Sequence, residues 1–148
     1  MKFSLAFVAA VLSASSAAAD PAADTQVASM MAATPQWTIK GLKRVCDKPN
    51  TTCTWTFGID AHKGAVTNCK YVVKGAKAST KNGGPSKCGD YTITSGWSGQ
   101  FGPGQGFTVL SVVNKNRQIV YPGYTDKQVS SGKVVKPDQS YAPQSLPK

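Results

Sequence analysis

The residues of this sequence that could perform acid–base chemistry are its carboxylates and one histidine. All 7 acidic residues are Asp, and His62 is the only histidine. Asp60, Asp90 and Asp126 lie at predicted strand ends or turns, so two of them could form the carboxylate pair that glycoside hydrolysis requires. Asp is also an ordinary residue of turns and a surface counter-charge for lysine. We favour this structural role and keep paired-Asp hydrolysis as an alternative.

His62 lies in the predicted turn 60–64 beside a lysine, and no nucleophile motif such as G-x-S-x-G accompanies it. We therefore assign it no catalytic role. Secreted ribonucleases and ribosome-cleaving toxins use general acid–base chemistry that resembles a His/Glu/His arrangement, which one His and no Glu cannot supply. A metal site built from two or three histidines is excluded in the same way. We expect a protein that is not an enzyme and needs no cofactor and no metal.

The spacing of the 4 cysteines predicts disulfides and not a metal site. Cys46, Cys53, Cys69 and Cys88 form no C-x-x-C pair, which argues against zinc and thioredoxin-like sites. In a small chain whose first 19 residues predict secretion, as described below, they indicate two disulfides. Four cysteines allow three pairings, and we favour Cys46–Cys53 with Cys69–Cys88 because each bond closes a local loop between neighbouring strands.

The loop between Cys46 and Cys53 also contains a possible modification site. Asn50-Thr51-Thr52 is the only N-x-S/T sequon of the chain. A sequon in an exposed loop of a secreted protein is an acceptor for N-linked glycan, so we predict glycosylation of Asn50.

Residues 1–19 have the three-part pattern of a secretory signal peptide. Lys2 precedes an apolar stretch and then a run of small residues, which predicts cleavage after Ala19 and an extracellular location. The apolar stretch is shorter than the ~20 residues that a membrane span requires. Residues 20–34 contain no aromatic residue and are predicted to be a flexible leader. Residues 35–148 then form a single domain.

Period-two alternation dominates residues 35–148 and predicts strands with one face on a core. The alternating positions are Trp37 and Ile39; Trp55, Phe57 and Ile59; Cys69, Tyr71 and Val73; Tyr91 and Ile93; Phe107, Val109, Ser111 and Val113; and Ile119 and Tyr121. Turn-rich segments separate them, so we predict an all-β fold, a small antiparallel β-sandwich or barrel stapled by two disulfides. The tail beyond Thr125 holds one possible strand, Lys133–Val135, and otherwise packs as extended chain or frays.

Two segments are candidates for a recognition surface. Residues 91–114 contain no charge, and glycines surround Trp97 and Phe101 within them. These glycines either meet the backbone demands of a long hairpin loop or accompany an aromatic contact surface for a glycan or protein receptor. Four lysines bracket a second loop and could form a basic patch. The candidate recognition residues are Trp97, Phe101, Lys74, Lys77, Lys81 and Lys87.

The charge balance indicates the class of partner. The chain has 17 basic residues, and loss of Lys2 with the signal peptide leaves a net charge of +9. Only two of the basic residues are Arg, the residue favoured for recognition of bases and phosphates, so nucleic acid is a poor match. An anionic cell-wall polysaccharide or a plasma membrane surface is a better match. We expect a monomer.

From Trp37 onward the sequence resembles a family of small secreted proteins of plant-associated filamentous fungi, the hypersensitive response-inducing protein 1 type elicitors. Most of residues 36–145 take part, and the strings that carry the resemblance lie at 37–44 (WTIKGLKR), 53–59 (CTWTFGI), 94–101 (TSGWSGQF) and 124–128 (YTDKQ). The resemblance implies a secreted, β-rich, non-enzymatic protein that triggers plant cell death and defence, with no catalytic residues to carry over.

These observations predict a secreted fungal effector or elicitor that is recognised at the plant cell surface by a receptor or at the plasma membrane. The alternative is a carbohydrate-binding module associated with the cell wall.

Overall fold

The computed structural model describes residues 35–147, and the elements below belong to the compact unit Gln36–Lys148. The predicted signal peptide (1–19) and leader (20–34) lie outside the described residues. Within residues 35–147, no helix is long and apolar enough to cross a membrane.

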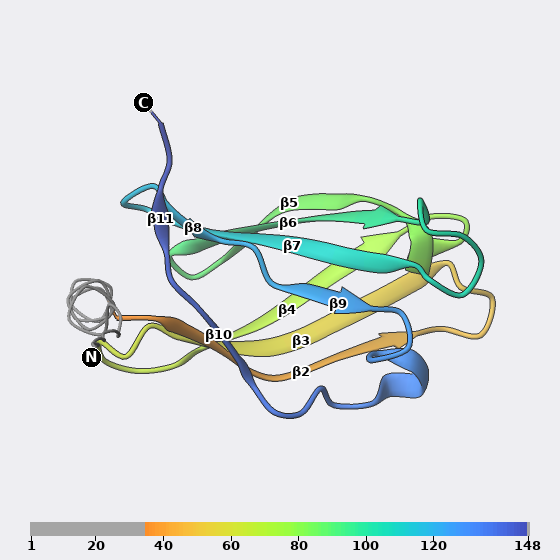
Figure 1. Cartoon of the computed structure of the whole chain (residues 1–148), viewed down its shortest axis with the longest axis horizontal. Helices are drawn as coiled ribbons and strands as arrows, with labels where there is room; N and C mark the ends of the chain where they lie inside the picture. The colour runs from red at the N-terminus through yellow and green to blue at the C-terminus, as the bar shows by residue number, and fades with distance from the viewer. Residues whose placement is uncertain (1–34, 148) are drawn as a thin grey trace, which may run out of the picture. The chain divides into compact units, whose positions relative to one another are not determined.

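Two antiparallel sheets face each other, which confirms the predicted all-β fold and makes it a sandwich (Figure 1). The first sheet has the strand order β10 (Gln139–Tyr141), β2 (Trp37–Cys46), β3 (Thr52–Asp60) and β4 (Thr67–Lys74). The second has the order β11 (Gln144–Ser145), β8 (Gln118–Val120), β7 (Phe107–Asn114), β6 (Tyr91–Ser98) and β5 (Gly83–Cys88), with β9 (Gly123–Thr125) paired to β7. Two short 3₁₀ turns, η1 (Ala78–Thr80) and η2 (Ser130–Gly132), lie in the connections.

The core fills the space between the sheets, and strand β3 shows why. Its apolar side chains alternate with threonines, so Trp55, Phe57 and Ile59 are buried while Thr54 and Thr56 point outward. The second sheet contributes buried aliphatic and aromatic residues opposite them. Aromatic rings meet across the two sheets, because Trp37 of β2 lies edge-on to Tyr91 of β6 with centroids 5.5 Å apart.

In β7 the predicted core face is wrong by one residue. The structure buries Thr108, Leu110 and Val112 and leaves Phe107, Val109, Ser111 and Val113 half-exposed. This strand is apolar on both faces, so alternation alone does not determine which face meets the core. Tyr121 was also predicted to be in the core, but it follows β8 and is 53% exposed.

A β-bulge in β2 changes which residues of the strand face inward. Lys40 pairs with Gly58 and Lys43 with Thr56, so β2 has one extra residue at this point, beside Gly41 with φ +60°. Inward-facing positions are therefore odd-numbered before the bulge and even-numbered after it. The bulge thereby places the side chain of Arg44 inside the protein.

The favoured disulfide pairing is confirmed, with Cys46 bonded to Cys53 and Cys69 to Cys88. The first bond joins β2 and β3, which are neighbours in one sheet. The second joins β4 to β5, which are successive strands of the chain but belong to different sheets. This disulfide therefore links the two sheets of the sandwich covalently, in addition to closing the loop between β4 and β5.

The segment after η2 forms a strap that connects the two sheets. The backbone amide of Val135 donates to the carbonyl of Leu42, and the Asp138 carboxylate accepts the amide proton of Gly41 at 2.9 Å. The chain then pairs with β2 as β10, crosses over, and pairs with β8 as β11 (Figure 1). The predicted strand at Lys133–Val135 is wrong, because strand pairing begins only at Gln139.

Buried tyrosines predict a loss of stability at alkaline pH. Burial raises the pKa of Tyr71, Tyr91, Tyr124 and Tyr141, and the carboxylates of Asp90 and Asp60 raise that of Tyr91 further. In the unfolded chain a phenol ionises near pH ~10, so above this pH the unfolded state releases protons that the folded state retains. The stabilisation is complete below pH ~10 and falls as the pH rises beyond it.

Thermal unfolding followed by circular dichroism from pH 8 to 11.5 checks this expectation. The melting temperature should fall steeply above pH ~10, and Tyr124→Phe should fall less steeply because one buried phenol is removed. Lysine deprotonation is common to both proteins and cancels in the comparison. Parallel curves for the two proteins would contradict the assignment.

Candidate functional site

Three loops gather at one end of the sandwich, and we call this surface the loop end (residues 47–51, 75–82 and 99–106; Figure 1). Backbone hydrogen bonds tie the first two loops together, since the amide of Gly75 donates to Thr51 and that of Ala78 donates to Asn50. The third loop is tied in through β6, where the amide of Trp97 donates to Asn82 Oδ1 at 3.0 Å. The loop end is thus held as one surface.

The Asp126 carboxylate is the centre of this arrangement. Oδ1 lies 3.3 Å from Nη1 of Arg44, and Oδ2 accepts a hydrogen bond from the indole Nε1 of Trp97 at 3.0 Å. The amide of Asp126 donates to the carbonyl of Gly106, which closes the β6–β7 loop onto the segment after β9. One carboxylate therefore joins β2 of the first sheet to β6 of the second.

Arg44 is an interior cation, with 9% of its side chain exposed. Its guanidinium lies over the Trp55 ring, 5.6 Å from the centroid, and Nη1 also donates to the carbonyl of Ser79 in η1 at 3.4 Å. Among residues 35–147, Nε of Arg44 is buried without a hydrogen-bond partner. Asp126 is thus the carboxylate that compensates this buried charge.

Two glycines of the β6–β7 loop make room for the Trp97 ring. A Cβ at Gly99 would come within 2.5 Å of the indole Cη2, and one at Gly106 within 2.6 Å of Cζ2. The glycines of this loop therefore serve close approach, as expected for a long hairpin loop. Trp97 is half-buried and positions the loop, whereas Phe101 is 67% exposed and stacks on Phe107 with centroids 5.8 Å apart.

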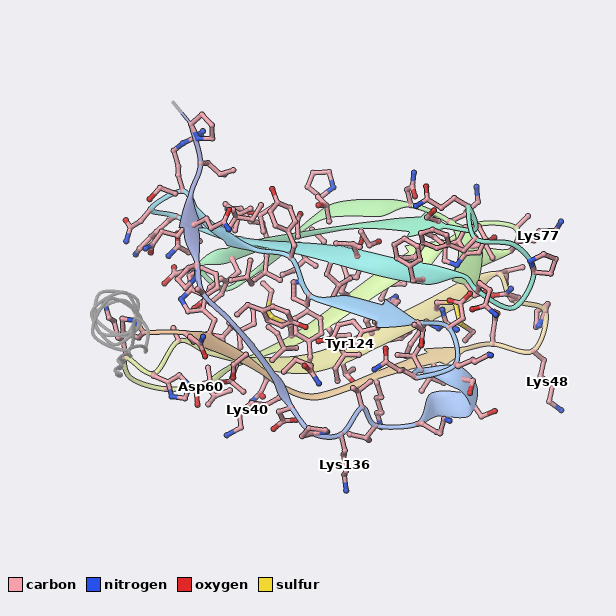
Figure 2. The ribbon with its side chains drawn as sticks, viewed as in Figure 1. Lys40, Lys48, Asp60, Lys77, Tyr124 and Lys136 are labelled. Atoms are coloured by element: carbon pink, nitrogen blue, oxygen red, sulfur yellow. A yellow bond between two sulfur atoms is a disulfide. The ribbon has the colours of Figure 1, made fainter. Side chains whose placement is uncertain are left out.

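The structure brings three of the four candidate lysines to the loop end. Lys74 ends β4, while Lys77 and Lys81 flank η1, and all three are exposed. Figure 2 shows Lys77 pointing into solvent at the same end of the sandwich as Lys48. Lys87 is not part of the group, because it lies in β5 opposite Thr92. Lys87 is five positions along the chain from Asn82, the nearest residue of the loop end, so it lies about 15 Å from that surface.

The aspartates considered for hydrolysis each have their own cation. Asp60 lies 3.9 Å from Lys40, Asp90 lies 3.8 Å from Lys115, and Asp126 pairs with Arg44. These separate ion pairs agree with the structural role that we favoured. Within residues 35–147, no cluster of three or more His, Cys or Asp side chains could hold a metal ion.

His62 belongs to a hydrogen-bonded group at the far end of β3. Nε2 lies 2.9 Å from Thr38 Oγ1, and Nδ1 lies 3.6 Å from Asp60 Oδ2. Thr38 Oγ1 in turn lies 2.8 Å from Oγ of Ser140 in β10. Thr38 is therefore the residue that links β2 to the strap, and His62 contacts the same hydroxyl group.

Asn50 has a structural role in addition to being the predicted glycan acceptor. Its Nδ2 donates to Ser79 Oγ at 2.8 Å, and its Oδ1 accepts the amide proton of Ser79 at 3.0 Å. It also has φ +56°, a backbone conformation that Asn tolerates better than most residues. Glycosylation of Asn50 stays a prediction.

Sequence reasoning missed the Arg44–Asp126–Trp97 group. The available signal was Gly41 just before Arg44, because a glycine within a strand often marks a bulge that changes the inward-facing positions. The partners of Arg44 could not be predicted from this signal, because Asp126 lies 82 residues further along the chain.

The fold and the site define a class: a small β-sandwich, stapled by two disulfides, with a basic and internally braced loop end. Comparison with known proteins narrows this class. A family model described as "Effector TSP1" matches residues 38–146. A protein of Hypocrea virens named "Effector TSP1" is 55% identical over 149 residues, which cover 99% of this chain and 100% of that protein.

The chain belongs to the Effector TSP1 family. An effector family was expected from the resemblance, and that part of the prediction is confirmed. The narrower assignment to the hypersensitive response-inducing protein 1 type stays a prediction.

Removal of the Asp126 charge should destabilise the protein. In Asp126→Asn the interior guanidinium of Arg44 loses its counter-charge, which costs about 3 kcal/mol, the lower part of the range for a broken buried pair because Asp126 is partly exposed. The matched control is Asp90→Asn, which breaks an exposed pair worth at most about 1 kcal/mol. Urea unfolding at pH 7 measures both, and equal free energies of unfolding for the two variants would refute the central role of Asp126.

The two roles of Asn50 can be separated by two variants. Both Asn50→Gln and Thr52→Val remove the sequon, but only Asn50→Gln removes the contacts with Ser79. In protein made by a bacterium that attaches no glycan, Asn50→Gln should lose about 1–2 kcal/mol of stability and Thr52→Val much less. Intact mass of wild-type protein from a fungal host reports whether Asn50 carries glycan. Equal stability of the two variants would argue against the structural role.

Proposed function

We propose that this protein is a secreted fungal effector that triggers hypersensitive cell death and defence in plants, and that its loop end is the surface recognised by a plant cell-surface receptor. Membership in the Effector TSP1 family supports the effector role. Two disulfides support an oxidising, extracellular destination. The predicted signal peptide at residues 1–19 supports secretion by the fungus.

The observation that carries the receptor proposal is the bracing of the loop end. Loops that are already fixed lose little conformational entropy when they bind, so more of the interaction energy appears as affinity. Here Asp126 fixes the β6–β7 loop through Trp97 and Gly106, and Ser79 fixes the β2–β3 loop through Asn50. A mobile loop would need no such set of side-chain contacts.

The chemistry of the loop end indicates what the receptor surface offers. Phe101 is the aromatic side chain most exposed among residues 35–147, and it is supported from behind by Phe107. Lys74, Lys77 and Lys81 surround the neighbouring loop. An apolar pocket for Phe101 with a rim of acidic residues would complement this surface, since buried aromatic anchors and charge complementarity are the usual sources of affinity and rate.

The proposed activity is binding and not catalysis. The aspartates of the described chain that could pair for hydrolysis are each engaged with a separate cation. Asp60 and Asp126 also accept hydrogen bonds that hold the backbone or another side chain in place.

Leaf infiltration tests the proposal. Purified mature protein should cause ion leakage and a defence burst. Phe101→Ser, or the triple change of Lys74, Lys77 and Lys81 to Gln, should raise the dose needed for the same response at least tenfold. Lys87→Gln is the matched control, because this lysine lies in the same stretch of sequence but away from the loop end. The melting temperature of each variant should stay within a few degrees of wild type.

Two results would overturn the proposal. Absence of any response to the wild-type protein in several hosts would reject the elicitor role. A full response to both the Phe101 and the triple-lysine variants would reject the loop end as the recognised surface.

A further inference from the structure

The outer face of strands β2, β3 and β4 is a second basic surface, separate from the loop end. Cross-strand pairing places Lys43, Thr56 and Lys70 in one row and Lys40, Gly58 and Asn68 in the next row. Paired residues point to the same side of a sheet. The neighbours of Thr56 in sequence are buried, so this row lies on the outer face, as Lys40 does in Figure 2.

This face contains a groove with a lysine at each side. A shallow, open hollow of about 400 Å³ is lined by Lys40, Gly41, Thr56, Gly58, Asn68 and Lys70, together with buried neighbours in the floor. Strand spacing and rise place the Cα atoms of Lys40 and Lys70 about 12 Å apart, two strands and two residues from one another. An elongated ligand lying in the groove can therefore contact both ammonium groups.

Gly58 gives the groove its depth. A Cβ at this position would come within 2.9 Å of Val66 Cγ1 and 3.3 Å of Asn68 Oδ1, so any larger residue would fill the hollow between the two side chains. Gly58 has no positive φ that would require glycine for backbone reasons. The close approach of Val66 and Asn68 therefore explains why this position is a glycine.

The groove offers charge and hydrogen bonds and no aromatic ring. The aromatic side chains of β2–β4 are all buried, so none is available to stack on a base or a neutral sugar; they are Trp37, Trp55, Phe57 and Tyr71. Arg44 also faces the interior, and the cations of the face are lysines. Lysine is a hydrated point charge that pairs with an anion without a fixed geometry, whereas nucleic-acid recognition favours Arg and stacking.

Two carboxylates lie at one side of the groove: Asp60, which ends β3 and lies 3.9 Å from Lys40, and Asp138 of the strap, which accepts the amide proton of Gly41 at 2.9 Å. A negatively charged ligand is therefore attracted along the lysine rows and repelled beyond Lys40. The same lysines would repel a second copy of this chain. Charge complementarity thus selects an anionic, linear ligand with hydroxyl groups that Thr56 and Asn68 can bond.

We propose that the outer face of β2–β4 is a binding groove for an acidic polysaccharide, a linear polyuronate whose carboxylates pair with Lys40 and Lys70 while its chain lies over Gly58. This goes beyond the proposed recognition by a plant receptor and does not depend on it. The two surfaces would allow the protein to be retained on an acidic wall polymer while the loop end stays accessible.

Binding of oligogalacturonates of defined length, measured by titration calorimetry with the purified protein at low salt, tests this inference. The double variant Lys40→Gln/Lys70→Gln should bind about tenfold more weakly, as expected for two exposed ion pairs. Lys127→Gln/Lys133→Gln is the matched control, since it removes the same charge from exposed positions outside the groove and should change the affinity less than threefold.

Two further arms separate groove binding from general charge attraction. Gly58→Ala keeps the charge and should weaken binding several-fold; because its Cβ displaces Val66, its melting temperature is measured as well and binding is compared where both proteins are folded. The same oligosaccharides with methyl-esterified carboxyl groups should not bind. Equal losses in the two lysine pairs, or equal binding of the esterified sugar, would overturn the proposal.

A third arm addresses a membrane as the occupant. Vesicles of phosphatidylserine are the probe, and the expected result is that the Lys40/Lys70 pair affects vesicle binding no more than the control pair does. A larger loss on vesicles than on oligogalacturonate would show that the face binds lipid, and the polysaccharide proposal would be wrong. Because these measurements use no plant cells, their outcome is independent of the leaf response.

Discussion

The interaction on which the loop end depends is the contact of the Asp126 carboxylate with two partners from different sheets. Arg44 brings a full charge into the interior, which is tolerated only with a nearby counter-charge. The second carboxylate oxygen holds the Trp97 indole, and this ring lies against Gly99 and Gly106. The course of the β6–β7 loop is therefore linked to the bulge in β2 that turns Arg44 inward. A single carboxylate thus couples strand register in one sheet to loop shape in the other.

The parts of the fold that could be predicted are those with a one-sided pattern. In β3 the polar residues at alternate positions leave one possible core face, and the cysteine spacing favours the two local disulfides that are present. In β7 both faces are apolar, so the pattern permits either face and the wrong one was predicted. The prediction that Lys87 lies in the same patch as Lys74, Lys77 and Lys81 was wrong, because β5 runs away from the loop end. The Arg44–Asp126 pair was not predictable, since it needs both a bulge and a contact 82 residues away.

Arg44 differs from the lysines of the two basic surfaces in where its charge lies. The weakly hydrated guanidinium of Arg44 lies inside, over an aromatic ring, while strongly hydrated lysine ammonium groups cover the loop end and the outer face of β2–β4. The positive charges of the protein therefore have different roles. Arg44 is paired inside the protein, whereas several of the lysines form two separate exposed surfaces to which we assign two different partners.

The strap described above also bears on when the protein can fold. Residues 139–145 complete both sheets, and the Thr38–Ser140 contact spans 102 residues of sequence. Contacts of such separation make folding slow, because a long segment of chain must be ordered before they form. In a ribosome-bound chain that lacks these residues, β2 and β8 are the edge strands that β10 and β11 later cover. Both sheets are therefore complete only once the chain has been synthesised past residue 145, so the last strands to leave the ribosome join β2, the first strand of the described chain, and β8.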